Sequence, residues 1–341
     1  MEKIHFESPS SDMLSTLLRN NALSGLVPEF PAGEIQEDGL EPDSAADERL
    51  ERFRELLDNE THMNVHKLAK EARNGVPEEV RSEVWKYILG VLRPEKSDEI
   101  SYQQKLQKEY NEFVSHIYDD DEVVRRVVHE VRRLKALSTS TAQFFSREDK
   151  SKGKLDENMF VRLISIQLGR SRMQIEYYPT MVRLVAPLLQ VNRAESDAYY
   201  CFDALMKKHE AFFTRDGLNR AVTNFLTLLR ALEPEFVSHL ESEEVEPNSW
   251  VPAWMQTLLA GQLARPLLLR LWDTYFASSE GLELHTYVCL AVVTWMRDEL
   301  LDQEGPDISE SLLNLPSTMF MDQIITRAYN IREDVVGRRL L

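Results

Sequence analysis

The chain has 341 residues, a net charge of −17 and 43% apolar residues, enough to build one large core or two smaller ones. A nucleic-acid-binding protein needs a basic face to neutralise phosphates, so the strong negative charge argues against that class. Only 12 glycines occur, and strand-like alternation is rare. Leu, Glu, Arg, Ala and Lys dominate, and this composition favours an all-helical fold.

The two cysteines, Cys201 and Cys289, lie inside apolar helical runs, which predicts reduced core residues rather than a disulfide. The opening residues MEKIHFESPS lack the apolar region of a signal peptide. The longest apolar run, 287–296, is shorter than the roughly 20 residues that span a bilayer. We therefore expect a cytoplasmic protein, with peripheral attachment to endomembranes left open.

Residues 1–45 cluster Pro, Gly, Ser and acidic residues, as in EDGLEPDSAAD, and we expect an acidic, largely disordered leader. Apolar residues at helical spacing then appear in DERLERFRELLDNE, which predicts a helix over 46–58 within a helical lead-in over 46–66. Gly75 ends a short helix, and Gly90 is placed to form a left-handed cap after the next one.

The rest of the chain alternates helical periods with two charged loops, 146–158 and 241–248. No repeat of fixed period occurs, which disfavours a regular solenoid. Further helices are predicted at about 99–117, 121–137, 158–170, 177–191, 195–212, 214–230, 232–241, 252–261, 265–278, 282–301, 307–314 and 320–333.

No motif for catalysis on a small molecule occurs in the sequence. The eight histidines are scattered, and only His62 and His66 stand four apart, without the acidic pattern of a metal site, so no metal site is predicted. Gly-rich phosphate loops and the GxSxG elbow are absent. We therefore expect no cofactor of the chain's own.

The stretch 73-RNGVPEEVRSEVWKYILG-90 is unusually specific in composition and spacing. Pro77 is suited to the start of a helix, and the acidic residues after it are favoured by the helix dipole. Arg81 and Trp85 then lie one turn apart on one helix face. Helix packing alone is a sufficient explanation of these residues.

A second specific stretch is 269-LRLWDTYFASSEGLELHTYVCLAVV-293. Trp272 is expected to pack as an aromatic anchor, and Asp273 is expected to cap a helix or to pair with Arg270. Core packing is again sufficient to explain each residue taken alone.

Together these stretches resemble the TBC domain, the family of Rab GTPase activators. The pattern R-x-G-[IV]-P-x-x-x-R-x-x-x-W-x-x-[LI]-L-G is matched over 73–90, and R-L-W-D-x-[YF] and L-H-x-Y-V-C-L-A follow in order. LLNLPST (312–318) is similar to the family's closing helix and turn. The resemblance spans 67–335, leaves 336–341 as a tail, and implies an all-α, two-lobed, V-shaped fold.

The resemblance also implies a partner, a Rab-type small GTPase received in the groove between the lobes. This partner would carry the GTP and Mg²⁺. No oligomeric state is predicted. The side chains expected to contact the partner are Arg81, Trp85, Glu130, Arg270, Trp272 and Asp273.

A TBC domain is expected to supply an arginine from an I-x-x-D-x-x-R motif, which places positive charge on the phosphoryl group during hydrolysis. Val127-x-x-Glu130-x-x-Arg133 matches this motif in spacing and charge type, with Val for Ile and Glu for Asp. Arg133 is therefore the candidate arginine finger. The same helix carries other basic residues, and a solvated basic face stays open as the alternative.

The family also supplies a glutamine from a Y-x-Q motif, in a stretch similar to 176-EYYPTMVRLVAPLL-189. Tyr177 matches the family tyrosine, and Pro179 occupies the glutamine position. Proline has neither a side-chain amide nor a backbone N–H, so it cannot orient water as glutamine would. Proline is well tolerated in the first helical turn, and we expect a helix to start near Pro179.

Three hypotheses follow. The first is a Rab-directed activator, acting in vesicle trafficking, that uses Arg133 and leaves the GTPase to use its own glutamine. The second is a catalytically inactive TBC module that binds a small GTPase or scaffolds a regulatory complex. The third is a generic helical interaction protein of similar layout.

Overall fold

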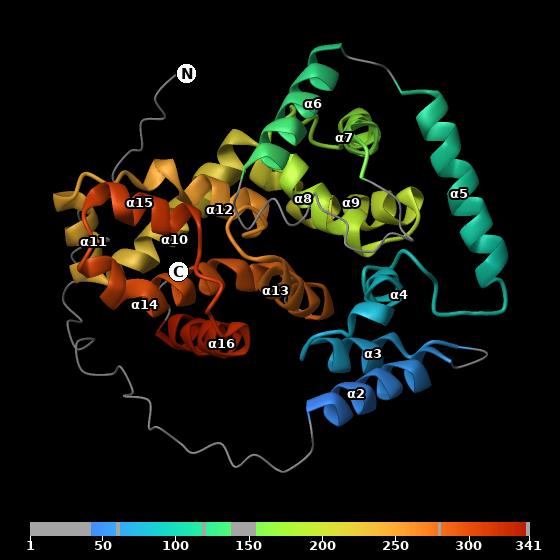
Figure 1. The fold of residues 1–341 in the computed structure, drawn as a ribbon, viewed down its shortest axis with the longest axis horizontal. Coiled ribbons are helices and arrows are strands. Elements are labelled where there is room, and N and C mark those ends of the chain that lie inside the picture. Colours follow the sequence, from blue (N-terminus) through green and yellow to red (C-terminus); the bar gives the residue numbers. More distant parts are fainter. Residues whose placement is uncertain (1–41, 59–61, 118–120, 138–154, 279–280, 339–341) are drawn as a thin grey trace.

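The computed structural model describes residues 42–338 apart from 59–61, 118–120, 138–154 and 279–280. Every named element in these residues is helical, which confirms the predicted all-α fold (Figure 1). The elements are α2 (Pro42–Leu57), α3 (Val65–Ala72), α4 (Glu78–Ile88), α5 (Glu99–Ser115), α6 (Asp121–Ala136), α7 (Glu157–Arg170), α8 (Thr180–Val191), α9 (Glu195–His209), η3 (Glu210–Phe213), α10 (Arg215–Leu232), α11 (Pro234–Ser242), η4 (Pro247–Ser249), α12 (Val251–Thr257), α13 (Arg265–Ala277), η5 (Gly281–Leu284), α14 (His285–Leu301), α15 (Gly305–Leu313) and α16 (Met321–Arg338).

The predicted segment boundaries differ from the structure at several points. Helix α2 begins at Pro42, inside the predicted leader, whose residues 1–41 lie outside the described residues. Most of the predicted loop 146–158 also lies outside them, and its last two residues open α7. Helix α16 runs through Arg338, past the predicted boundary at residue 335.

The helix predicted over 252–261 ends early, at Thr257. Leu258 and Leu259 follow with φ of 51° and 64°, in the left-handed region that stops an α-helix. Both leucines are fully buried. The apolar run therefore continues into the core after the helix has ended, which is why its composition suggested a longer helix.

Gly90 adopts the left-handed conformation that the sequence suggested, and Gly75, which was predicted to end a short helix, is left-handed as well. Gly90 follows α4 with φ of 74°, and Val91 N donates to Lys86 O at 2.8 Å across the helix end. Gly75 follows α3 with φ of 97°. A Cβ at residue 75 would also lie 2.8 Å from Cδ of Arg270, so the position needs glycine for space as well as for conformation.

Two clusters of buried apolar side chains form the interior. The larger one joins α4–α16 and contains Trp85, Trp250, Trp254 and Trp272. The smaller one is built by α2, α3, α4 and the end of α13, and it contains Phe53. Helix α4 serves both clusters, because Trp85 enters the larger one while Val84 and Tyr87 enter the smaller one.

The two cysteines are buried and free, as predicted for reduced core residues. Within the described part of the chain, none of the helices combines the length and apolar character needed to cross a bilayer.

Helix α13 holds the N-terminal and C-terminal helices together. It contacts α3 and α4 on one side and α16 on the other, and Figure 1 shows it between these groups. Further along the chain α6 packs against α7 and α8, and α8 also packs against α12. These two places, the α4–α13 contact and the α6–α8 contact, carry the residues singled out in the sequence.

Candidate functional site

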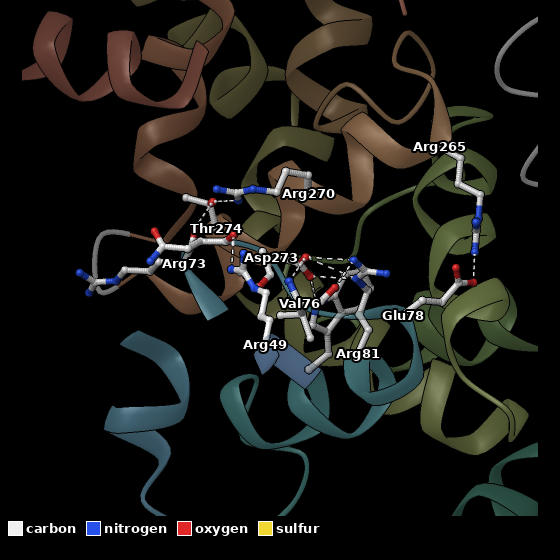
Figure 2. A network of polar contacts seen from close by, with 12 residues as sticks. Arg49, Arg73, Val76, Glu78, Arg81, Arg265, Arg270, Asp273 and Thr274 are labelled. Carbon is white, nitrogen blue, oxygen red and sulfur yellow. Dashed lines mark hydrogen bonds and ion pairs between the residues drawn. The ribbon is translucent and has the colours of Figure 1, made fainter. Parts of the chain in front are cut away.

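The buried carboxylate of Asp273 on α13 ties the two specific sequence stretches together (Figure 2). It accepts hydrogen bonds from Val76 N at 2.8 Å, from Trp85 Nε1 at 2.7 Å and from Arg81 Nε at 3.1 Å. Its side chain has no solvent exposure, and burial raises the pKa of Asp273, while Arg81, Val76 N–H and Trp85 N–H oppose that shift. Arg81 and Trp85 therefore do lie on one helix face, and both face inward.

Arg270 takes part in a neighbouring set of contacts. Its Nη1 donates to Thr274 Oγ1 at 2.7 Å, its Nη2 pairs with Asp322, and Thr274 Oγ1 donates to Arg73 O at 2.9 Å. The predicted pairing of Asp273 with Arg270 is therefore wrong. Residues three apart on a helix are close enough to pair, but Asp273 points to α4, where three donors meet it, and Arg270 points to α16.

The prediction that these side chains contact a partner is wrong for Trp85, Trp272 and Asp273, because each is completely buried. The indole rings of Trp85 and Trp272 pack with centroids 6.2 Å apart, and Trp272 Nε1 donates to Leu258 O at 3.2 Å. The guanidinium groups of Arg81 and Arg270 are engaged in the internal contacts described above. This motif network stabilises the contact of α4 with α13.

The α6 residues of the arginine motif have a different environment. Arg133 Nε and Nη2 donate to Glu130 Oε2 and Oε1, each at 2.7 Å, in a bidentate ion pair within one helical turn. The Arg133 side chain is 45% exposed, whereas that of Glu130 is 7% exposed. The hydrogen bonds that Arg133 donates to Glu130 raise the pKa of Arg133. Glu130, another predicted partner contact, is therefore buried beneath Arg133 and unable to make that contact in this arrangement.

Tyr177 lies beside this pair, in the segment that leads into α8. Arg126, two helical turns before Arg133, stacks on the Tyr177 ring at 5.0 Å and donates to Tyr177 O at 3.4 Å. The ring is buried, and its hydroxyl has no hydrogen-bond partner among the described residues. Burial raises the pKa of Tyr177, the charge of Glu130 raises it further, and Arg126 opposes the shift.

Pro179 is exposed and occupies the N-cap position of α8, with φ of −55° and ψ of −26°. The expected helix start is confirmed, since a missing N–H has no cost where no helical acceptor exists. The next residue, Thr180, donates from Oγ1 to Gln256 Oε1 at 3.2 Å and joins α8 to α12. The position that the sequence comparison of motifs assigned to the family glutamine is therefore at the surface, and it carries no amide.

Sequence reasoning missed Arg183, which lies one turn after Pro179 on α8. Its guanidinium lies against Gly261, where an added Cβ would stand 2.2 Å from Nη1 of Arg183. Burial lowers the pKa of Arg183, the charge of Glu130 raises it, and that of Arg133 lowers it. One signal was available, because Arg183 is the only charged residue in the otherwise apolar run TMVRLVAPLL.

A cavity of about 830 Å³ opens beside Arg126 and Tyr177. Its lining includes Arg126 and Tyr177 from the site, together with Phe113, Arg170 and Ile175. The surface beside Arg126 and Tyr177 is thus hollowed.

Comparison with known proteins places this arrangement in a family. The family model described as "Rab-GTPase-TBC domain" matches residues 78–301, which is most of the described chain. The chain belongs to this family, as its motifs suggested. The match covers α4 to α14 and so includes Arg81, Trp85 and Asp273 of the network, together with the α6–α8 site.

The similar proteins include a TBC1 domain family member and a GTPase-activating protein. TBC1 domain family member 22A of Macaca fascicularis is 26% identical over 312 residues, which cover 83% of this chain and 62% of the relative. The GTPase-activating protein gyp1 of Schizosaccharomyces pombe is 26% identical, over 82% of this chain and 60% of the relative. The chain thus spans about three-fifths of the length of these relatives.

A solved structure confirms the fold. The Ypt/Rab-GAP domain of Gyp1p matches with a TM-score of 0.72 at 20% identity, over 86% of this chain and 99% of the solved one. The likeness at this identity concerns the arrangement of helices.

Proposed function

We propose that the chain is a GTPase-activating protein for a Rab-family small GTPase, with Arg133 as the arginine finger. The observation that carries the proposal is the position of Arg133, a half-exposed guanidinium at the arginine-motif position of a TBC-family chain, on the face of α6 that meets Tyr177. The relatives named as GTPase-activating proteins support the same activity class.

GTP hydrolysis in the complex has two chemical requirements. Charge that develops on the phosphoryl oxygens needs a cation, and the attacking water needs an orienting group. Arg133 supplies the cation once its side chain rotates from Glu130 towards the nucleotide. The partner GTPase carries the GTP and Mg²⁺, and the chain needs no cofactor of its own under this proposal.

Pro179 leaves the second requirement to the partner. No side-chain amide is present at this surface position, so we propose that the GTPase orients the water with its own glutamine. The exposed proline then contributes shape to the interface, beside the cavity that adjoins Tyr177.

A second candidate function is a catalytically inactive TBC module that binds a small GTPase or scaffolds a regulatory complex. Pro179 favours it directly, since the position lacks the group that the family chemistry uses. The bidentate pairing of Arg133 with Glu130 favours it as well, because the finger must give up two charge-assisted hydrogen bonds to act.

A Rab partner would also set where the protein acts. We propose a cytoplasmic protein that works at the surface of endomembranes, in vesicle trafficking, and reaches the membrane through its partner.

Single-turnover GTP hydrolysis by a panel of GTP-loaded Rab proteins tests the proposal. We expect wild type to accelerate hydrolysis by at least one Rab, and Arg133→Ala to remove about 10³-fold or more of that acceleration. Arg132→Ala is the matched control, because Arg132 is the next residue on α6 and pairs at the surface with Glu157. It should leave the rate within about twofold.

The same panel separates the two candidates. Acceleration that survives Arg133→Ala contradicts the finger assignment. If no Rab responds to wild type but a pull-down retains GTP-loaded Rab, the inactive binding module is the better description. If neither hydrolysis nor binding is found with any Rab, both candidates fail.

A further inference from the structure

The ion pair on α6 raises a problem for any movement of Arg133. Glu130 is buried on α6, and Arg133 is the partner that both of its carboxylate oxygens use. A buried carboxylate that loses its partner is strongly destabilising. If Arg133 leaves Glu130, other groups are therefore needed to stabilise the buried Glu130 carboxylate.

Two groups beside Glu130 suit that role. Arg183 lies on α8, which packs directly on α6, and its side chain is largely shielded from water. Tyr177 is buried in the segment just before α8, and its hydroxyl has no partner among the described residues. A buried hydroxyl without a partner is uncommon and calls for an explanation. The charge of Glu130 acts on the pKa of both groups, which fits their closeness to its carboxylate.

The other arginines near Glu130 are committed elsewhere. Arg126 stacks on the Tyr177 ring and pairs with Glu122 at 3.9 Å. Arg132 pairs with Glu157 on the opposite side of the helix at 3.0 Å. Arg183 has no ion pair within 4.0 Å among the described residues.

We propose that Arg183 and the Tyr177 hydroxyl replace Arg133 as partners of Glu130 when Arg133 turns towards the nucleotide. Arg183 is then a positioning residue that frees the finger, placed one turn beyond the position where the chain lacks the family glutamine. The importance of this exchange for catalysis rests on the proposed function, whereas the exchange of partners around Glu130 does not.

Gly261 is part of the same arrangement. A side chain at this buried position would overlap the Arg183 guanidinium, with the new Cβ 2.9 Å from Cδ and 2.2 Å from Nη1. Glycine at 261 therefore leaves the space in which the Arg183 side chain lies. Gly261→Ala displaces Arg183 without removing its charge, and Gly261 is not among the glycines with positive φ, so alanine fits its backbone.

A double-mutant cycle in urea unfolding tests the exchange without any GTPase. Either single variant, Arg133→Ala or Arg183→Ala, should leave Glu130 one cationic neighbour. The double variant should leave Glu130 no cationic neighbour. Its unfolding equilibrium constant should therefore exceed, by about tenfold, the value expected from multiplying the fold-changes of the two single variants. In a Glu130→Gln background this excess should disappear, because no charge is left to stabilise.

Two further variants complete the cycle. Tyr177→Phe should be nearly neutral in wild type and destabilising with Arg133→Ala, because the hydroxyl gains its partner only after Arg133 has left. Arg132→Ala combined with Arg183→Ala is the control and should show no excess. If the double variant does not fold, Gly261→Ala replaces Arg183→Ala in the same cycle. A cycle without excess overturns the proposal, whether or not the chain activates a GTPase.

Hydrolysis assays test the consequence for catalysis. Arg183→Ala should lower the maximal stimulated rate about tenfold, with the half-saturating concentration changed less than about twofold. Adding Glu130→Gln should restore the rate, since Arg133 is then no longer held. A purely structural role of Arg183 predicts no such rescue, and its absence overturns the positioning role. If the double-mutant cycle shows the excess while no Rab is stimulated in the hydrolysis assay, that result would support the exchange of partners around Glu130 and would contradict the proposed function.

Discussion

The network around Asp273 and the site around Arg133 carry similar residues in opposite environments. Each contains an acidic side chain that is buried from solvent and paired with an arginine. Asp273 is surrounded by donors from α4 and the turn before it, and its arginine is largely buried. Glu130 is paired within its own helix, and its arginine is half exposed. The first pair fixes two helices, whereas the second keeps a cation at the surface.

This difference shows what the sequence motifs report. The long motif over 73–90 and its counterpart over 269–293 are matched most completely, and they build the contact between α4 and α13 (Figure 2). They therefore identify the fold. The residues that we propose for the family chemistry lie on α6 and before α8, and Pro179 is where this sequence departs from the expected motif.

Asp273→Ala is the strongest test of the buried side of the comparison. It leaves Arg81, Trp85 Nε1 and Val76 N without their acceptor, and we expect a loss of about 3–5 kcal/mol in the free energy of unfolding. Urea unfolding measures it. Arg133→Ala should change this free energy by no more than about 1 kcal/mol, because we expect Arg183 and the Tyr177 hydroxyl to take over its contact with Glu130. Equal losses would remove the distinction drawn between the two pairs.

Acid should lower the free energy of unfolding, because two histidines are buried in their neutral form. Burial lowers the pKa of His209 to about 4 and that of His285 to about 3, below the ordinary value of about 6.5. The unfolded chain therefore binds protons first. The free energy of unfolding contributed by the two neutral histidines is complete above pH 6.5 and is lost progressively as pH falls from there to these folded values.

We expect a loss of about 2 kcal/mol per histidine in the free energy of unfolding between pH 7 and pH 5. Urea titrations at pH 7, 6 and 5 measure it. His285→Gln should be less stable at pH 7 but should show a shallower pH dependence. An unchanged slope in that variant would contradict the role given to His285.

Gly75→Ala tests the turn that brings the first motif to α13. Alanine is strained at φ of 97°, and its Cβ would meet Arg270 Cδ at 2.8 Å. We expect a loss of about 1–2 kcal/mol, measured by thermal or urea unfolding. Gly337→Ala is the control, because it lies in α16 with open space around it, and it should be neutral or slightly stabilising.

Pro179→Gln tests whether the missing amide at the exposed site limits GTP hydrolysis. Glutamine suits the α-helical φ and ψ of this position, so stability should change by no more than about 0.5 kcal/mol. The stimulated hydrolysis rate should rise about tenfold if the amide reaches the water. Pro179→Ala, which lacks the amide, should not raise it. Equal rates for the two variants would show that the missing glutamine does not limit the reaction.

The sequence was informative where local rules decide the structure. Helix periods and the glycines at 75 and 90 predicted most elements, and Pro179 predicted the start of α8. Leu258 and Leu259 defeated the helix prediction over 252–261, because apolar composition does not report a left-handed backbone.

The candidate site was harder to predict, since pairing across the chain has no local signal. Asp273 faces Arg81, which lies 192 positions earlier, instead of the nearby Arg270. Burial of Trp85 and Trp272 likewise follows from the packing of α4 on α13, so their conspicuous sequence pattern suggested a partner surface that does not exist there. Arg183 needed the contact with Gly261 to become visible.

The small core around Phe53 sets a practical limit on how the protein can be shortened for study. The family match begins at residue 78, yet Val84 and Tyr87 of α4 are covered by side chains from α2 and α3. Arg49 of α2 also donates to Gly75 O at 2.8 Å, at the turn that leads into α4. A polypeptide trimmed to the matched span would expose an apolar surface on α4 and would be prone to aggregate. A fragment for study should therefore keep every residue from Pro42 onward.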